Sequence, residues 1–176
     1  NARRNAKNFE LESLRETVTF CHLHGTAVHL TVNTLVFDRE LPSAMETVRA
    51  ACEAGVDALI VQDLGLARFI RQAAPDMPIH ASTQMSLHNL SGVQLLEPFG
   101  YTRAVLAREM NAEEIAQVCR GTTMEIETFV HGALCMCLSG QCYLSAVAGE
   151  RSGNRGLCAQ PCRLPFYEKN PQRCGL

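Results

Sequence analysis

The sequence predicts an α/β protein, a fragment of a TIM-like (β/α) barrel, on the basis of three observations. Short apolar runs rich in β-branched residues alternate with amphipathic helical runs through the first 130 residues. The apolar runs recur about every 20 to 30 residues, a spacing typical of parallel βαβ units. No Gly-x-Gly-x-x-Gly motif follows any of them, which favours the barrel over a doubly wound sheet that binds a dinucleotide.

The individual elements follow from this periodicity and from the residues that end helices. Gly25 and Gly55 each come directly after a helical run, where glycine commonly closes a helix. Asn111 is placed to cap the start of another helix. The expected helices cover residues 10–24, 42–54, 64–74, 88–99 and Ala112–Cys119. The expected strands are Val28–Val32, Ala58–Val61, Ile79–Ala81, Ala104–Ala107 and Glu125–Val130.

The periodicity stops near His131, where glycine and cysteine become frequent. We therefore expect residues 1–130 to form a partial barrel and residues 131–176 to form a Cys/Gly-rich segment of the same domain. A complete barrel has eight strands and about 250 residues. The chain is accordingly expected to be a fragment, with one strand before Asn1 and two or more after Leu176.

Polar residues follow every expected strand. In a (β/α) barrel these positions surround one mouth, where catalytic groups lie. Helix caps and turns use the same residue types, so a single such residue is weak support and five strand ends together are stronger. The candidates at the strand ends are Asn33, Thr34, Gln62, Asp63, His80, Gln84, Arg108, Glu109, Glu127 and His131.

The net charge of −2 gives no overall case for binding nucleic acid, but the charge is unevenly distributed. From residue 150 onward five cations face two acids, a balance of +3 that leaves −5 for the first 149 residues. Arg151, Arg155 and Arg163 are therefore candidate ligands for an anionic partner such as RNA, the alternative being a solvated loop. No apolar run approaches the roughly 20 residues that span a membrane.

Six of the nine cysteines fall within the last 42 residues, and the density of this group indicates metal coordination. Four thiolates, at Cys135, Cys142, Cys158 and Cys162, could hold zinc or an iron–sulfur cluster. The uneven spacing and the absence of paired Cys-x-x-Cys elements are easier to reconcile with a cluster, although spacing alone leaves both metals open. Disulfides are the less favoured alternative, because the strong helix and strand periodicity suggests a reducing, cytoplasmic location.

Three further cysteines and one histidine have other interpretations. Cys21, Cys52 and Cys119 lie inside helical patterns and are expected to be small buried apolar residues. His131 stands four residues before Cys135, so a Cys–His protease site is conceivable, although the expected strand and the glycines disfavour the required geometry.

A resemblance to a known family emerges from the residues around the first cysteines. The segment resembles the signature of the peptidase U32 family at Glu127, Phe129, Gly132, Ala133, Leu134, Cys135, Gly140, Cys142, Leu144 and Ser145. The segments Thr31–Leu35, Val61–Asp63, His80–Met85 and Arg151–Arg163 also look like family segments, so the resemblance runs over essentially the whole chain.

The resemblance implies two activities of different classes. Some members of the family are described as metal-dependent, collagenase-like peptidases. Others are implicated in hydroxylation of tRNA uridine, of a 23S rRNA cytidine or of ubiquinone precursors, and in the ubiquinone branch conserved cysteines hold a [4Fe-4S] cluster. By position, Cys135, Cys142 and Cys158 match three ligands of that pattern, and the fourth is Cys162 or a residue beyond Leu176.

The favoured interpretation is an iron–sulfur-dependent hydroxylase acting on a pyrimidine of tRNA or 23S rRNA. His80, Gln84, Arg108, Glu109, Glu127 and His131 would line its pocket, Asn33 and Asp63 would contact substrate, and the three arginines would meet phosphate. The alternative is a peptidase that binds a peptide and uses zinc or another divalent metal with Glu127 or His131 as acid–base groups. A His-Glu-x-x-His motif, which would support the peptidase, is absent. A third possibility is that the fragment binds nothing alone.

Overall fold

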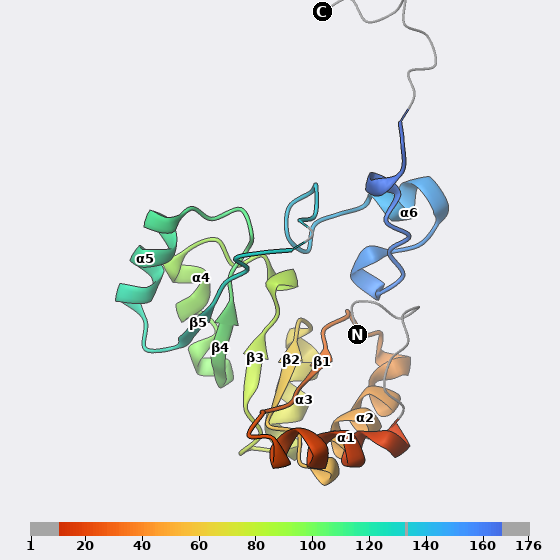
Figure 1. The fold of residues 1–176 in the computed structure, drawn as a ribbon, viewed down its shortest axis with the longest axis vertical. Coiled ribbons are helices and arrows are strands. Elements are labelled where there is room, and N and C mark those ends of the chain that lie inside the picture. Colours follow the sequence, from red (N-terminus) through yellow and green to blue (C-terminus); the bar gives the residue numbers. More distant parts are fainter. Residues whose placement is uncertain (1–10, 133, 167–176) are drawn as a thin grey trace, which may run out of the picture.

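Five parallel strands form one sheet in the computed structural model, which describes residues 11–132 and 134–166. The strands are β1 (His29–Val32), β2 (Ala58–Val61), β3 (Ile79–Ala81), β4 (Tyr101–Val105) and β5 (Glu125–Glu127), and each pairs with the next in the chain (Figure 1). Within the described residues the sheet is open, because β1 and β5 are its two edges. The predicted fold class, a fragment of a (β/α) barrel, is confirmed.

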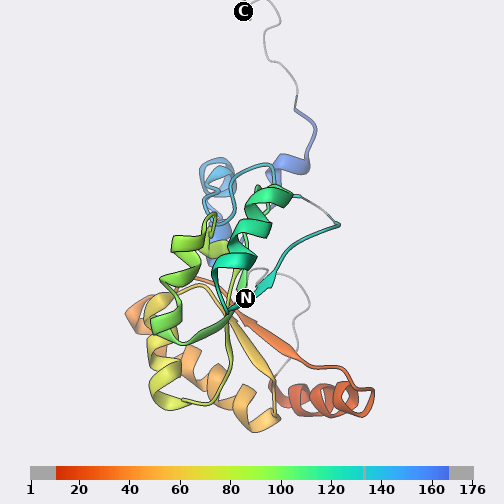
Figure 2. The ribbon, with the colours of Figure 1, turned by 90° about the vertical axis from the view of Figure 1, so that its left-hand side faces the viewer.

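Helices that follow the first four strands cover one face of the sheet, whereas α1 (Leu11–Leu23) precedes β1 and α6 (Leu144–Gly149) lies beyond the carboxyl ends of the strands (Figures 1 and 2). The helices that follow the strands are α2 (Leu41–Ala54), α3 (Leu64–Ala73), α4 (Leu90–Gln94) and α5 (Ala112–Gly121). Short 3-10 helices lie at Asp38–Glu40, Thr83–Met85, Glu97–Phe99, Gly153–Arg155 and Pro161–Arg163. None of the helices in the described residues is long and apolar enough to span a bilayer.

The two faces of the sheet differ in chemistry. Side chains alternate along a strand, so every second residue points to the helices. On the helix-covered face, Leu59, Val61, Ile79, Ala81 and Ala104 are all 0% exposed and belong to the apolar core. Full burial of a large apolar side chain is worth about 1.5–3 kcal/mol, so this face supplies most of the stability of the sheet. The opposite face, which would line the interior of a barrel, carries polar and charged residues.

Local signals fix the ends of several helices. The Asp63 carboxylate accepts a hydrogen bond from the Leu66 amide at 2.9 Å and caps α3. Asn111 and Glu114 form a reciprocal capping box at the start of α5, as the sequence predicted for Asn111. Gly55, at φ 82°, ends α2 in the left-handed conformation.

Three predicted elements have the wrong bounds. The helix expected over residues 88–99 is α4 followed by a separate 3-10 turn at Pro98, because proline cannot donate an interior helical hydrogen bond. The strand expected at Ala104–Ala107 begins earlier and ends at Val105. The strand expected to reach Val130 ends at Glu127, and Phe129 and Val130 beyond it are exposed.

The segment that follows β5, with its cysteines, lies beyond the carboxyl ends of the strands (Figures 1 and 2). We call residues 134–166 the cysteine segment. It contains α6, which the sequence analysis did not predict. Ala133 of the family signature and Cys174 of the cysteine group lie outside the described residues. The same holds for Glu168, Lys169 and Arg173, which were counted in the charge balance.

Candidate functional site

Ser139 fixes the cysteine segment to the mouth of the sheet. This residue is 0% exposed, and its hydroxyl accepts hydrogen bonds from the Arg108 amide at 3.3 Å and from Arg108 Nε at 3.1 Å. The Ser139 amide and hydroxyl in turn donate to Glu109 Oε1 at 2.9 and 3.3 Å. The predicted strand-end pair Arg108–Glu109 therefore meets the loop between Cys135 and Cys142.

A second set of contacts comes from the turn after β3. The Ser86 hydroxyl donates to the Ser139 carbonyl and accepts from Gln141 Nε2 at 3.1 Å. His88 completes the set, because its Nε2 lies 3.3 Å from Glu109 Oε2 and its Nδ1 lies 2.7 Å from the Ser86 carbonyl. We call Ser86, His88, Arg108, Glu109 and Ser139 the latch.

Gly140 allows the loop to approach the mouth this closely. Its φ of 73° is left-handed, and a Cβ at this position would lie 2.0 Å from the carbonyl oxygen of Gln84. Any other residue would clash with backbone that cannot move away easily. The predicted site residue Gln84 thus supports the loop through its carbonyl, which also accepts from Gln62 Nε2 at 3.4 Å.

Two of the candidate metal ligands, Cys142 and Cys158, lie close to Gly153. A Cβ on Gly153 would be 3.6 Å from the Cys158 Cβ and 4.0 Å from the Cys142 carbonyl oxygen. Ser145, buried at 3% exposure, holds the same region together because its hydroxyl accepts from the Ala159 amide at 2.9 Å.

The other two candidate ligands flank a separate contact. Arg163 Nη2 donates to the Leu134 carbonyl, which brings the residue before Cys135 next to the residue after Cys162. The 3-10 turn that contains Cys162 also packs against α6, which begins two residues after Cys142.

The donor chemistry of these cysteines fits a thiolate-bound metal or cluster. All four are free, with Cys142 and Cys162 partly buried and Cys135 and Cys158 exposed. Among the described residues, however, no three His, Cys, Asp or Glu side chains are close enough together to hold a metal ion. One shared site would require the four thiols to lie closer together.

The three candidate arginines have different surroundings. Arg155 is committed to structure: it makes a two-pronged ion pair with Glu40 at 2.6 and 2.8 Å, donates to the Leu35 carbonyl and lies over the ring of Phe37. Arg151 and Arg163 are exposed, and each donates to a backbone carbonyl of the cysteine segment. Their remaining N–H groups are the ones that could meet a phosphate.

Among the other predicted strand-end residues, Asn33, Glu127 and Asp63 make hydrogen bonds, whereas His131 makes none with the described residues. Asn33 is buried and donates to the Ser82 hydroxyl at 3.4 Å across the mouth. Glu127 accepts from Arg103 Nη1 at 3.3 Å. Asp63 is committed to its cap and to the Val36 amide. His131 is exposed and makes no hydrogen bond or ion pair with any residue that the structure describes.

Two titratable groups near the mouth are shifted by their surroundings. Burial, reinforced by Arg103 and His29, lowers the pKa of His80 from 6.5 to about 4, so this imidazole is neutral near pH 7. Burial acts to raise the pKa of Glu109, but hydrogen bonds from its own backbone and from Ser139 outweigh it, so the pKa is lowered and the carboxylate stays ionised.

The prediction for the cysteines outside the cluster was partly wrong. Cys52 is partly buried and packs against the apolar core, as expected, and Cys21 is partly buried as well. Cys119 is exposed, because it lies on the face of α5 that points away from the buried Val118.

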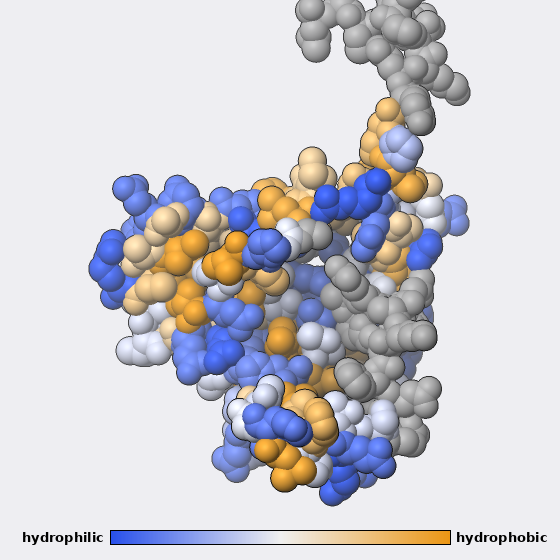
Figure 3. All heavy atoms as spheres, viewed as in Figure 1, coloured by the Kyte–Doolittle hydropathy of each residue, from blue (hydrophilic) through white to orange (hydrophobic). Residues whose placement is uncertain are grey.

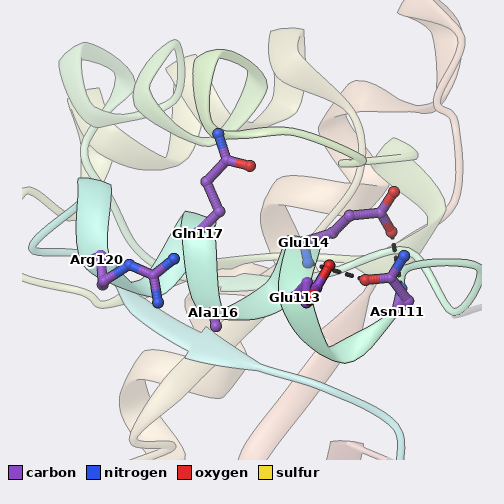
Figure 4. Close-up of a pocket in the computed structure, with 6 residues that line it drawn as sticks. All are labelled: Asn111, Glu113, Glu114, Ala116, Gln117 and Arg120. Carbon is purple, nitrogen blue, oxygen red and sulfur yellow. Dashed lines mark hydrogen bonds between the residues drawn. The ribbon is translucent and has the colours of Figure 1, made fainter.

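A separate hollow lies along α5 and is not part of the mouth. It is lined by exposed and capping residues of one helix, as Figure 4 shows: Asn111, Glu113, Glu114, Ala116, Gln117 and Arg120. The Asn111 amide and the Glu114 carboxylate drawn there are engaged in the capping box. We assign this hollow no function.

Sequence reasoning missed the residues that hold the latch together. Ser86, His88 and Ser139 were not singled out, since isolated serine and histidine in loops carry little signal. The available signal was Gly140, a glycine that lies between Cys135 and Cys142 in the sequence.

The chain is similar in sequence and in fold to known proteins. Residues 1–173 match the family model described as peptidase family U32. A 23S rRNA 5-hydroxycytidine C2501 synthase of Escherichia coli is 42% identical over 171 residues, covering 97% of this chain and 26% of that protein. The tRNA hydroxylation protein P1 of Bacillus subtilis is 38% identical over 164 residues, covering 93% of this chain and 39% of that protein.

A relative with a different name is similar over the same region. A collagenase of Porphyromonas gingivalis is 33% identical over 178 residues, covering 95% of this chain and 42% of that protein. The chain thus spans less than half the length of each of these three curated relatives. Among solved structures, the U32 peptidase Mk0906 superposes with a TM-score of 0.62 at 18% identity, over 97% of this chain and 70% of that one, which shows a shared fold. The chain belongs to peptidase family U32.

Proposed function

We propose that this chain is the part of an RNA-modifying enzyme that adds a hydroxyl group to a pyrimidine of tRNA or 23S rRNA in the cytoplasm. The observation that carries the proposal is the latch, which holds the cysteine segment directly over the polar mouth of the sheet. The relatives named for tRNA and 23S rRNA hydroxylation, at 38% and 42% identity over nearly the whole chain, support the same assignment.

We propose a [4Fe-4S] cluster as the cofactor, which Cys135, Cys142, Cys158 and Cys162 would hold. Such a cluster, when bound, supplies one-electron chemistry. The latch keeps the loop that bears Cys135 and Cys142 at the mouth. Close packing at Gly153, the hydrogen bond from Arg163 to Leu134 and the packing of the Pro161–Arg163 turn on α6 bring parts of this segment together.

The protein groups around the mouth would bind and orient the RNA. Arg151 and Arg163 are the exposed cations of the cysteine segment, so they would contact phosphate while the mouth receives the base. Arg155 is excluded from this role by its ion pair with Glu40. Glu127 and His131 stand on the path from β5 into the cysteine segment.

A peptidase is the second candidate, because the collagenase of Porphyromonas gingivalis is similar over 95% of this chain. Within the described residues, no hydrogen bond joins a cysteine thiol to a histidine, so the Cys–His arrangement considered from sequence is not formed. The cysteine-rich mouth and the exposed arginines favour the RNA substrate.

The test is to express the protein in cells and to measure the modified nucleosides in their RNA. Cells lacking their own RNA hydroxylation proteins would express the protein, and digested RNA would be analysed by mass spectrometry for pyrimidine nucleosides with one added oxygen. We expect such nucleosides with the wild-type protein and none with Cys142→Ser. Cleavage of gelatin by the purified protein, with unmodified RNA, would establish the peptidase instead.

A further inference from the structure

The inward face of the sheet, opposite the helices, carries mostly polar side chains, with Ala58, Ile60 and Val105 as its apolar members. Alternation places His29, Thr31 and Asn33 of the β1 line, and Ile60 and Gln62 of the β2 line, on this face. The neighbouring strands add His80, Ser82, Arg103, Glu125 and Glu127. TIM barrels usually fill this space with bulky branched apolar side chains, so the polar face indicates a different use.

Contacts that cross from β1 to β3 confirm which way these side chains point. The rings of His29 and His80 meet edge to face with centroids 4.7 Å apart, although β2 lies between the two strands. Asn33 reaches Ser82 over the same strand. Side chains can meet across an intervening strand only on one common face of the sheet.

Two buried polar atoms on this face lack partners. Gln62 is 9% exposed and His80 is 5% exposed, and neither Gln62 Oε1 nor His80 Nδ1 has a hydrogen-bond partner among the described residues. The Gln62 amide nitrogen donates to the Gln84 carbonyl, which holds the side chain in place and leaves its oxygen as an acceptor without a partner among the described residues. Leaving a buried polar group unpaired costs about 1–3 kcal/mol, so two such atoms on adjacent strands point to a ligand that pairs with them.

The charge of the face limits what this ligand can be. Arg103 places a guanidinium group on this face, and that group is already paired with Glu125 at 2.7 Å and with Glu127 at 3.3 Å. The inward face therefore favours a neutral molecule over a phosphate or a carboxylate. His80 is neutral near pH 7 and can either donate or accept.

We infer that the inward face is a pocket for a neutral pyrimidine base turned out of its RNA, with Gln62 and His80 as its specificity-determining residues. The identity of the ligand as a base rests on the proposed function. An amino or ring N–H group of the base would donate to Gln62 Oε1, and His80 Nδ1 would hydrogen-bond a second polar group on the ring edge. Enzymes that modify a base remove it from the stack in this manner.

The test uses two variants that keep shape and remove the unpaired atom, Gln62→Met and His80→Phe, with Gln117→Met on the exposed face of α5 as the matched control. In the ligand-free protein we expect His80→Phe to melt at the wild-type temperature or above it, because it removes an unpaired buried atom. Gln62→Met also loses the hydrogen bond to the Gln84 carbonyl, so its melting temperature does not enter this comparison. A polar group that served only the fold would lower the melting temperature when lost.

Binding is then measured with an RNA hairpin that carries one fluorescent cytidine analogue in its loop. Anisotropy reports RNA binding, and fluorescence intensity reports removal of the base from the stack. We expect a base signal with wild-type protein and with Gln117→Met, and a loss of about tenfold with Gln62→Met and with His80→Phe, while the affinity for the hairpin changes little.

The outcomes separate this inference from the proposed function. If the RNA binds but both variants give the wild-type base signal, or if His80→Phe melts lower than wild type, the pocket is overturned and the proposed function stands. If wild-type protein binds no RNA, the proposed function fails and free cytidine becomes the probe. A shift of the Gln62 side-chain amide resonances on adding cytidine would then still support the pocket, and no shift would overturn it.

Discussion

The helix-covered sheet and the cysteine segment are held in place by different kinds of interaction. The sheet rests on apolar residues that are completely buried, from Leu59 to Ala104. The cysteine segment exposes Leu134, Met136 and Leu138, and orange apolar residues are visible on the surface in the upper part of Figure 3. It is held by a few polar contacts and one glycine. The comparison teaches that the scaffold is stabilised by packing, whereas the placement of the cysteines depends on single hydrogen bonds.

The largest effect is expected where the sheet meets its helices. Leu66 is 0% exposed in the core, so Leu66→Ala should lower the free energy of unfolding by about 2–5 kcal/mol. Denaturant unfolding followed by circular dichroism measures this loss. The control is Phe69→Ala on the same helix, whose side chain is 45% exposed and should cost far less. Equal losses in the two variants would contradict the assigned core.

The next largest effect should be the loss of docking between the cysteine segment and the sheet. Gly140→Ala places a Cβ against the Gln84 carbonyl at a left-handed φ, which should destabilise docking of the loop by about 2–4 kcal/mol and leave the sheet folded. Hydrogen exchange of the Ser139 amide, which donates to Glu109, reports the docking.

Gly149→Ala is the control for this substitution, because nothing lies within 4 Å of a Cβ at that position. In Gly149→Ala, the Ser139 amide should exchange its hydrogen at the wild-type rate. Slow exchange of Ser139 in Gly140→Ala would show that the close approach does not hold the loop.

These two substitutions also mark how far the sequence could predict the structure. Periodicity predicted all five strands and five of the helices, because burial of Leu66 and its neighbours follows from a repeated pattern. The position of Gly140 on Gln84 could not be predicted, since it depends on contacts between residues far apart in the chain. The same holds for Arg155, a candidate phosphate ligand by charge that the fold commits to Glu40. The ligand set of the four cysteines stays a prediction.

A smaller effect is expected from the latch hydroxyl. Ser139→Ala removes the acceptor for Arg108 and one donor to Glu109, so docking should weaken by about 1–3 kcal/mol. The rate of hydrogen exchange in the loop should rise, with the unfolding of the sheet unchanged. Ser91→Ala, at an exposed position of α4, is the control. Identical exchange in both variants would remove Ser139 from the latch.

The smallest effect is a pH dependence at the other contact of the cysteine segment. The hydrogen bond from Arg155, and then that from the Phe37 amide, lower the pKa of Glu40 from 4.5 to about 2. A depressed pKa in the folded state stabilises it above pH 4.5, and this contribution is lost as the pH falls from 4.5 toward 2. Glu40→Gln should flatten that part of the stability profile. An unchanged slope in the variant would place the titration elsewhere.

The central claim is that the cysteine segment caps the mouth as a metal-binding unit, and anaerobic reconstitution tests it most directly. The protein would be treated with iron and sulfide under reducing conditions, and iron, sulfide and the visible absorption spectrum would be measured for wild type, Cys142→Ser and Cys119→Ser. We predict about four irons and a cluster absorption for wild type and for Cys119→Ser, whose thiol is exposed on α5, and loss of both for Cys142→Ser. Equal iron content in Cys142→Ser and wild type, or no iron in any of the three, would contradict the account.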